Sequence, residues 1–379
     1  MKNTKIGTRI IIALAFPVVA MLVFSGFMVV EKYQTKKEMG RVLELAELAP
    51  VISAVAHELQ KERGMSAGFI ASKGVKFARD LPEQRKLTNE KRTAMAEALK
   101  TFDAESFGDG ISENIAEAKK ALGNLASKRT DVTARKITVP QMAGYYTPTI
   151  GALLHIVEDM SGLSTEFHIT TAINAYTAFL QGKERAGIER AMGAGGFGAH
   201  QFKPVIHHKF VQLIAMQKTF LGRFNIHASQ EQKAFYKSTM TGPVVDEVNR
   251  MRKIAIDSPI TGSTGDVDAT HWFKTITAKI NLLKTVEDKI ASDLQASTAA
   301  IETAALTAFI VLAVITLVLM ILTAAMVYYV VTGITRPLAD MTDAMSALAE
   351  GDKKVEVPGT DRGDEIGAMA ETVQVFKDN

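Results

Sequence analysis

Cysteine is absent from the 379-residue sequence, which excludes disulfides, cysteine-ligated zinc and thiol catalysis. An excess of one charge sign is also missing, because 44 lysines and arginines stand against 41 acidic residues, for a formal net charge of +3. No basic cluster with interleaved aromatic residues occurs, so we expect no nucleic-acid partner. Alternating polar and apolar residues nowhere run long enough to form a sheet. The chain is therefore predicted to be all-α.

Residue patterns typical of enzymes and metal sites are missing as well. The histidines include no i,i+4 pair beside a carboxylate, and the adjacent His207 and His208 would face different directions on a helix. The glycine-rich segment GAGGFGAH follows a helical pattern and does not join a strand to a helix, as a phosphate-binding loop does. We therefore predict no enzymatic activity, no cofactor and no metal site.

Two long uncharged runs stand out against this background, from Ile10 to Val30 and from Thr303 to Thr335. A helix over residues 10–30 rises about 31 Å, which matches the hydrocarbon core of a bilayer. The first run is longer than the apolar core of a secretory signal, and no small-x-small cleavage site closes it. The sequence therefore predicts two transmembrane helices, over residues 10–30 and 303–333.

The charges around the first run set the expected topology. Lys2, Lys5 and Arg9 precede it, and positive flanks favour the cytoplasmic side. We expect a multi-pass protein of the inner (cytoplasmic) membrane, with residues 1–9 as a cytoplasmic N-terminus. Residues 31–302 then lie outside this membrane, in the periplasm of a cell that has an outer membrane.

The segment between the spans shows helical periodicity. Apolar residues recur three or four positions apart at Val42, Leu45, Leu48, Ile52, Val55 and Leu59, which describes one face of a helix. Further helices are predicted over residues 87–102, 111–128, 148–160, 164–192 and 210–224, and from Trp272 onward. Predicted breaks lie at SKGVKFARDLPEQ, SFGDG, ITVPQMAGYYTP, GAGGFGAH and DSPITGSTGD. The expected architecture is a set of stacked antiparallel helix bundles.

A near-repeat occurs within this segment, because ERGMSAG at residues 62–68 returns as ERAMGAG at residues 189–195. Five of the seven positions are identical, and the other two exchange one small residue for another. On helices, the glycines and alanines of each block form a narrow ridge that permits close approach. If the two ridges face each other, Arg63 lies near Arg190.

Two guanidinium groups at close range repel each other unless an anion lies between them. A planar oxyanion suits this position, because each guanidinium offers paired N–H donors. Ser66, one turn after Arg63, would add a neutral donor. The sequence thus predicts that Arg63, Arg190 and Ser66 bind a small oxyanion.

An alternative interpretation treats these arginines as solvated helix charges. Arg63 would then pair with Glu62 or another nearby carboxylate, and Arg190 with Glu184 or Glu189. A solvated face has no need of matched small residues, so the repetition of the whole block favours the oxyanion site. Duplication without functional use of the arginines also stays open.

Several segments resemble those of a known family. LQKERGMSAGF at residues 59–69 resembles the signature helix of the nitrate- and nitrite-sensing (NIT) domain of bacterial chemoreceptors, sensor kinases and antiterminators. QGKERAGIERAMGAGGFGAH resembles the second arginine-bearing helix of that family. LIAMQKTF and HWFKTITAKINLLKTVEDKIASDL resemble its closing helices. The resemblance spans most of residues 31–302.

This resemblance implies an all-helical sensor domain over residues 31–302, in which arginines hold nitrate or nitrite. By motif match, the ligand-binding role falls on Arg63 and Arg190. It extends less directly to Arg185 and Lys183, because the family varies at those positions.

The residues after the second span have a separate pattern. Ile334, Leu338, Met341, Met345 and Leu348 follow a 4-3-4-3 spacing, and a second amphipathic helix begins at Asp364 after a break from Gly351 to Gly363. Two short helices cannot bury their apolar seams alone, so we expect a homodimer with a parallel four-helix bundle. With Pro337 and the DEIG motif, residues 334–379 resemble a HAMP signal-relay domain. A generic juxtamembrane coiled coil is the alternative.

These observations together predict a dimeric transmembrane receptor. It senses a small oxyanion, nitrate or nitrite, and signals through HAMP to a partner on the cytoplasmic side, in chemotaxis. The final ETVQVFKDN is similar to chemoreceptors that continue beyond HAMP, so we expect the N-terminal part of a methyl-accepting chemotaxis protein. The alternatives are a receptor for another anion, a docking surface for a periplasmic binding protein, and the sensor portion of a histidine kinase.

Overall fold

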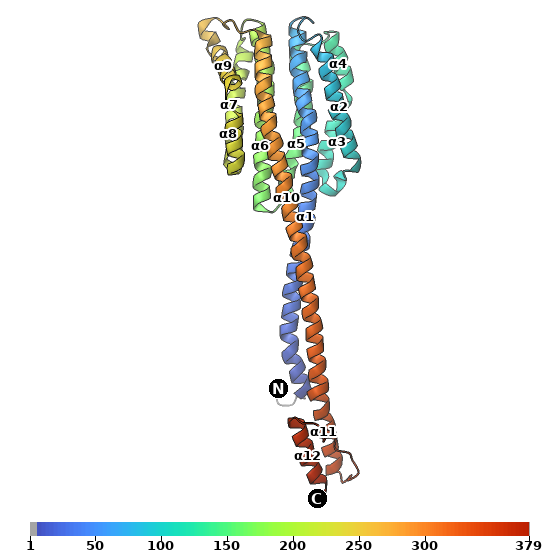
Figure 1. Cartoon of the computed structure of the whole chain (residues 1–379). Coiled ribbons are helices and arrows are strands. Elements are labelled where there is room, and N and C mark those ends of the chain that lie inside the picture. The colour runs from blue at the N-terminus through green and yellow to red at the C-terminus, as the bar shows by residue number, and fades with distance from the viewer. Residues whose placement is uncertain (1–5, 379) are drawn as a thin grey trace. The chain divides into compact units, whose positions relative to one another are not determined.

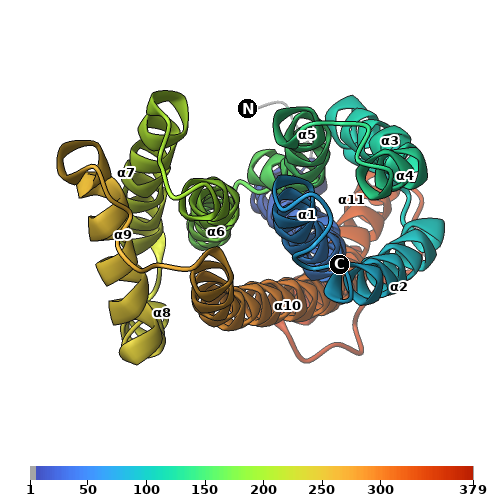
Figure 2. The same ribbon diagram turned by 90° about the horizontal axis from the view of Figure 1, so that it is seen from above.

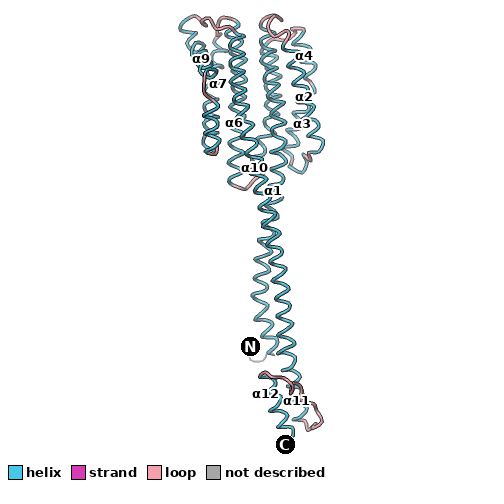
Figure 3. Tube along the Cα trace, viewed as in Figure 1, coloured by secondary structure: helices cyan, strands magenta, loops and turns pink. Residues whose placement is uncertain are grey.

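The computed structural model describes residues 6–378, and helices account for most of them (Figure 3). No strand occurs within that range, which confirms the all-α prediction. The chain forms two compact units, one of them Lys37–Glu302 and the other made of the residues on either side. Lys2 and Lys5, on which the predicted cytoplasmic N-terminus depends, lie outside the described residues, as does Asn379.

The unit Lys37–Glu302 consists of two groups of helices. Figure 2 shows α1 to α5 gathered on one side and α6 to α9 on the other, with the start of α10 beside α6. The first group is α1 (Ile6–Ala71), α2 (Asp80–Thr101), α3 (Asp109–Gly123), α4 (Leu125–Thr133) and α5 (Val139–Glu158), with 3-10 turns η1 (Ala104–Phe107) and η2 (Asp159–Gly162). The second is α6 (Phe167–Gly198), α7 (Pro204–His227), α8 (Gln230–Thr239), α9 (Pro243–Thr261) and α10 (Ala269–Val330).

A single apolar core runs through both groups. In the first, the predicted apolar face of α1 is buried along its length, and no residue from Val42 to Leu59 on that face is more than 5% exposed. In the second, the ring of Trp272 lies 5.4 Å from that of Phe197 and 5.6 Å from that of Phe210. These contacts hold α10 against α6 and α7, so the stacked helix bundles expected from the sequence are present.

Two predicted breaks are helical in the structure. The segment ITVPQMAGYYTP lies mostly within α5, because Thr138 and Gln141 form a reciprocal capping box and Pro140 sits in the first turn, where a missing N–H costs nothing. The segment GAGGFGAH continues α6 as far as Gly198. Two of its glycines are needed there for packing, because a Cβ at Gly193 would overlap the ring of Trp272 and one at Gly196 the ring of Phe202.

Other boundaries also differ from the prediction. Helix α2 begins at Asp80, inside the predicted break, and the helix expected over residues 111–128 is divided between α3 and α4. Helices α8 and α9 were not predicted. Both are rich in polar residues, which interrupt the apolar pattern that marks a helix in the sequence, and α8 begins with a capping box formed by Ser229 and Gln232.

The other unit contains the first part of α1 and the last part of α10, and both helices are long and apolar enough to cross a membrane. Large apolar side chains along them are exposed, among them Phe16 at 80% and Phe27 at 70%. Lipid is the solvent that accepts such side chains. The rings of Tyr33 and Phe309 lie 5.9 Å apart, so the two helices run side by side here. The exact limits of the spans stay predictions.

A π-helical turn, Val331–Thr335, separates α10 from α11 (Arg336–Ala349), and α12 (Glu365–Asp378) follows (Figure 1). Met341, Val357 and Ala370 form a small core between these helices. Met345, on the predicted seam of α11, is 51% exposed, and Phe376 on the amphipathic α12 is 75% exposed. A single chain thus leaves part of its apolar seam uncovered, and the homodimer stays a prediction.

Candidate functional site

The two repeated blocks face each other inside the unit Lys37–Glu302. Arg63 on α1 is 1% exposed, and Arg190 on α6 is 0% exposed. Both terminal nitrogens of Arg63 donate to the carboxylate of Glu184 on α6, at 2.7 and 3.3 Å. Arg190 in turn donates through Nη2 to the main-chain oxygen of Gln60 on α1, at 2.5 Å. The interpretation as solvated helix charges is therefore wrong.

Glycine makes this close approach possible on both helices. A Cβ at Gly64 would lie 3.0 Å from Nε of Arg190 and 2.7 Å from the ring of Phe273. A Cβ at Gly187 would lie 3.0 Å from Nη2 of Arg63. Each guanidinium group thus lies over a glycine of the facing helix, and any larger residue there would push it aside.

Two further helices complete the surroundings of the arginine pair. Nη1 of Arg63 donates to the hydroxyl of Thr147 on α5, at 2.9 Å. Nη1 of Arg190 donates to the hydroxyl of Thr277 on α10, at 3.0 Å, and its guanidinium lies 5.0 Å from the centre of the Phe273 ring. The pair is therefore held at the meeting point of α1, α5, α6 and α10.

Some polar atoms in this cluster have no hydrogen-bond partner among the described residues. They are Nε of Arg63, Nε of Arg190, Oγ of Ser66 and Oε1 of Gln60. A buried polar atom without a partner costs about 1–3 kcal/mol. A small ligand that accepts hydrogen bonds from the two Nε–H groups and the serine hydroxyl would relieve this cost.

The charges of the pair are not balanced. Arg63 has a counter-ion in Glu184, whereas Arg190 forms no ion pair with any residue that the structure describes. Burial, together with the positive charge of Arg63, lowers the pKa of Arg190 to about 9, and the negative charges of Glu184 and Glu58 offset this only in part. Two arginines and one carboxylate leave a net charge of one positive unit in a buried cluster.

The other predicted ligand-binding residues lie nearby. Ser66 is fully buried on α1. Lys183 forms a buried ion pair with Glu287 on α10. Arg185 is only half buried, bonds to Gln181 on its own helix and stacks on a phenylalanine ring of α7. No hydrogen bond or ion pair joins these three residues to Arg63 or Arg190 within the described part of the chain.

The glutamate that precedes each arginine has a role that the sequence did not predict. Glu62 and Glu189 are both 0% exposed. Arg129 on α4 donates two hydrogen bonds of 2.7 Å to the carboxylate of Glu62. Arg252 on α9 donates two hydrogen bonds of 2.6 Å to the carboxylate of Glu189. These paired contacts fix the rotation of α1 and α6. The sequence does contain a feature that points to this role, because the same glutamate precedes the arginine in both repeated blocks.

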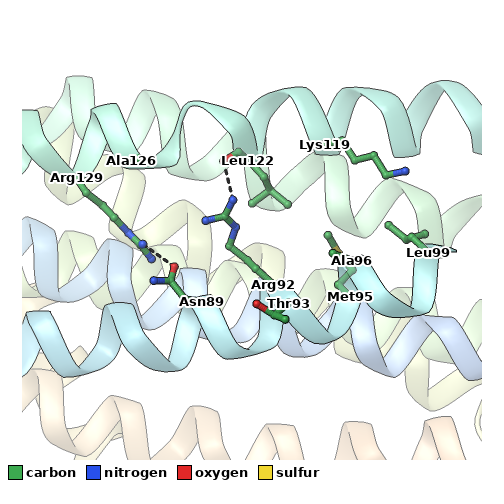
Figure 4. Close-up of a pocket in the computed structure, with 10 residues that line it drawn as sticks. All are labelled: Asn89, Arg92, Thr93, Met95, Ala96, Leu99, Lys119, Leu122, Ala126 and Arg129. Carbon is green, nitrogen blue, oxygen red and sulfur yellow. Dashed lines mark hydrogen bonds between the residues drawn. The ribbon is translucent and has the colours of Figure 1, made fainter.

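Two cavities lie near these residues. One, of about 250 Å³, is lined by α5, α6 and α7 and includes Thr147 and Glu184, which both contact Arg63. A second, of about 500 Å³, lies between α2 and the pair α3 and α4, with Arg92 and Arg129 directed toward it (Figure 4). Arg92 donates to the main-chain oxygen of Leu122 at 3.1 Å. In the second cavity both arginines already link helices, whereas the first cavity is lined by two residues that bond to Arg63.

Comparison with known proteins shows which families the chain matches. The family described as nitrate and nitrite sensing matches residues 54–295, and the HAMP domain family matches residues 329–379. A nitrate regulatory protein of Klebsiella oxytoca is 30% identical over 259 residues, which are 68% of this chain and 64% of that protein. A probable chemoreceptor of Sinorhizobium fredii, y4sI, is 46% identical over 59 residues, 16% of this chain and 8% of that protein. The chain thus spans less than two thirds of the length of either relative.

Among solved structures, that of the NasR transcription antiterminator is similar in fold, with a TM-score of 0.67 and 24% identity over 93% of this chain and 94% of that one. Both matched families are non-catalytic, which agrees with a receptor. The described helices include two that are able to cross a membrane. This chain therefore belongs to the nitrate- and nitrite-sensing family, as a membrane signal transducer that joins such a sensor domain to a HAMP domain.

Proposed function

We propose that Arg63 and Arg190 bind nitrate or nitrite, and that binding is relayed through the HAMP domain to a cytoplasmic partner. The observation that carries this proposal is the buried, unbalanced charge of Arg190 beside Arg63, with both Nε–H groups unpartnered among the described residues. Nitrate is a planar monoanion with three acceptor oxygens, so it matches both the charge and the available donors. Its binding would make the cluster neutral.

Three further residues have supporting roles in this proposal. Ser66 donates its hydroxyl to the ligand, because that oxygen is buried and without a partner among the described residues. Arg185 lines the cavity of about 250 Å³, and Lys183 is buried on the same helix. The positive charge of Arg185 attracts anions toward the cavity, and Lys183, through its ion pair with Glu287, holds α6 against α10 beside the arginine pair.

The contacts of Arg190 supply a path for the signal. It bonds to Gln60 on α1 and to Thr277 on α10. Helix α1 is continuous from Ile6 to Ala71, and α10 from Ala269 to Val330, so each contains both a part of the site and a predicted span. A ligand that draws Arg190 toward Arg63 changes the packing of these two helices. Small shifts of packed helices bias two-state elements such as HAMP.

The assembly and location belong to the same proposal. The exposed seam residues of α11 and α12 support a homodimer, in which the HAMP helices of two chains pack together. The basic residues before the first span support a periplasmic sensor domain and a cytoplasmic HAMP domain in the inner membrane. The likeness to part of a chemoreceptor supports an output in chemotaxis.

Calorimetry of the full chain in lipid nanodiscs tests the ligand and the site together. We expect nitrate or nitrite to bind, and chloride and sulfate to bind more weakly. Arg63→Gln and Arg190→Gln should abolish nitrate binding. Arg250→Gln is the matched control, because this exposed arginine pairs with Glu247 at the surface and should leave binding unchanged.

The outcomes separate the two parts of the proposal. Nitrate binding that survives both arginine substitutions would exclude this site. A wild-type protein that ignores nitrate and nitrite but binds another anion would exclude the ligand and retain the site. At a nitrate concentration of 100 times the dissociation constant, thermodynamic linkage predicts about 2.7 kcal/mol of added stability.

A further inference from the structure

Glu184 is built into the arginine pair as a permanent anion. It is 3% exposed, and its two oxygens accept hydrogen bonds from Arg63 and from the side-chain amide of Gln60, the latter at 2.7 Å. A carboxylate is itself a planar oxyanion, so Glu184 occupies the paired N–H groups of Arg63 in the way a ligand would. The ligand must then use the donors that remain.

The charged groups around the pair are balanced among themselves. Glu58 is paired with Lys61 at 3.1 Å. The next group along α6 and α10 contains two lysines and two carboxylates, which form ion pairs with one another: Lys183, Lys284, Glu287 and Asp288. Neither set adds a net charge to the arginine pair.

His57 completes this count. It is 6% exposed, and burial, with the positive charges of Lys183 and Lys61, holds its pKa well below the usual range. The imidazole is therefore neutral at physiological pH. The buried charges at the ligand position are those of Arg63, Arg190 and Glu184, which sum to one positive unit. Arg185 also interacts electrostatically with Arg63, but it is only half buried, so solvent screens its charge.

A net charge of one positive unit distinguishes between anions of different valence. A monovalent anion makes the buried cluster neutral, whereas a divalent anion leaves one negative unit in a medium of low dielectric, where isolated charge is strongly unfavourable. Resting on the function proposed above, we infer that Glu184 is a specificity-determining residue that restricts the site to monovalent anions. Without its charge, the two arginines would match a divalent oxyanion such as sulfate.

Size is a competing explanation for any rejection of sulfate, because sulfate is tetrahedral and larger than nitrate. The two explanations differ in what Glu184→Gln does. This substitution keeps the shape of the side chain and removes only its charge. Selection by charge predicts that sulfate gains more affinity than nitrate, and selection by size predicts no change in their ratio.

The test measures nitrate and sulfate affinities by calorimetry on the full chain in nanodiscs. In the wild type we expect sulfate to bind at least about tenfold more weakly than nitrate. Glu184→Gln should shift the sulfate-to-nitrate affinity ratio toward sulfate by at least about tenfold, or about 1.4 kcal/mol of differential binding. Glu184→Asp keeps the charge and should keep the wild-type ratio, even if a shorter side chain weakens both anions.

Glu58→Gln is the matched control. It removes the same formal charge from a buried position on α1, where Glu58 forms an ion pair with Lys61 and acts on Arg190 less strongly than Glu184 does. We expect it to change the ratio by less than about threefold. Proper folding is checked by the emission of Trp272, whose ring nitrogen donates to the main-chain oxygen of Arg190 at 3.0 Å. If Glu184→Gln fails this check, Glu184→Met removes the charge with a side chain of similar length.

Each result decides between the possibilities. An unchanged ratio in Glu184→Gln, or an equal shift in Glu58→Gln, overturns the inference while leaving nitrate binding intact. A wild-type protein that binds no monovalent anion overturns the proposed function as well. The expected pattern requires nitrate binding in the wild type, a shift toward sulfate in Glu184→Gln, and no shift in Glu184→Asp.

Discussion

Arg63 and Arg190 occupy equivalent positions in the two repeated blocks, yet the loss of their charges should have different effects on stability. Replacing Arg63 with methionine leaves the buried carboxylate of Glu184 with only the amide of Gln60 as a partner. Removing one member of a buried ion pair typically costs about 3–5 kcal/mol. For a folded unit of this size, that corresponds to a fall in melting temperature of roughly 6–20 °C.

Replacing Arg190 leaves no buried carboxylate without a partner, because Arg190 forms no ion pair with any residue that the structure describes. The fall of its pKa from 12.5 to about 9 means that its charge costs on the order of 5 kcal/mol in the folded protein at neutral pH. Methionine removes this cost but leaves Gln60 and Thr277 each without one hydrogen bond, at about 1–3 kcal/mol apiece. The net effect of Arg190→Met should lie between a loss of about 1 and a gain of about 3 kcal/mol.

The measurement is unfolding of the full chain in nanodiscs without added anion, followed by the fluorescence of Trp272. This is the only tryptophan of the sequence, and its partner is the main-chain oxygen of residue 190, which both variants retain. The double variant Arg63→Met with Glu184→Met should recover most of the stability lost in Arg63→Met, because no charge is left unpaired. Equal destabilisation by Arg63→Met and Arg190→Met would refute the reasoning, since it would mean that the charge of Arg190 is compensated.

Three other predictions concern neighbouring features. Gly64→Ala places a Cβ 2.7 Å from the Phe273 ring, so we expect thermal unfolding to show a loss of about 1–3 kcal/mol of stability. Gly222→Ala is the control, because its Cβ would have nothing within 4 Å, and it should stabilise the protein by about 0.5–1 kcal/mol. Arg252→Gln leaves Glu189 buried without its ion pair and should cost about 3–5 kcal/mol in denaturant unfolding; a loss below about 1 kcal/mol would contradict this. Burial and Arg252 lower the pKa of Lys279 to about 8, so the folded protein binds fewer protons than the unfolded chain above that pH. The free energy of unfolding should therefore rise by up to about 3 kcal/mol between pH 8 and 10.5, relative to that of Lys279→Met. If the free energies of unfolding of the two proteins change with pH in the same way, the effect is excluded.

Features that depend on local periodicity were predictable from the sequence. The apolar face from Val42 to Leu59 repeats every three or four residues, and the uncharged runs exceed what a water-soluble helix needs. The repeated blocks placed Arg63 and Arg190 on facing helices, because matched small residues serve close packing. The structure shows both arginines buried there.

Features that depend on relative helix rotation were not predictable. Glu184 was considered only as a partner of Arg190, on the same helix, whereas it pairs with Arg63 across the interface. Which arginine Glu184 meets depends on the rotation of α6 relative to α1. The ion pairs Arg129–Glu62 and Arg252–Glu189 fix this rotation, and each joins residues that are far apart in the sequence. Short helices such as α8 escaped prediction for a different reason, since their capping boxes and tertiary contacts outweigh a weak apolar pattern.

Both arginine-bearing helices come from one polypeptide, and this determines stoichiometry. Arg63, Arg190, Thr147 and Thr277 all meet within the unit Lys37–Glu302 of a single chain. Under the proposed function, every copy carries both ligand-binding arginines, and we expect an assembly of two copies to bind two ligands. We also expect that co-expression of an Arg63 variant with an Arg190 variant does not restore nitrate binding, because neither chain can supply its intact guanidinium to the other.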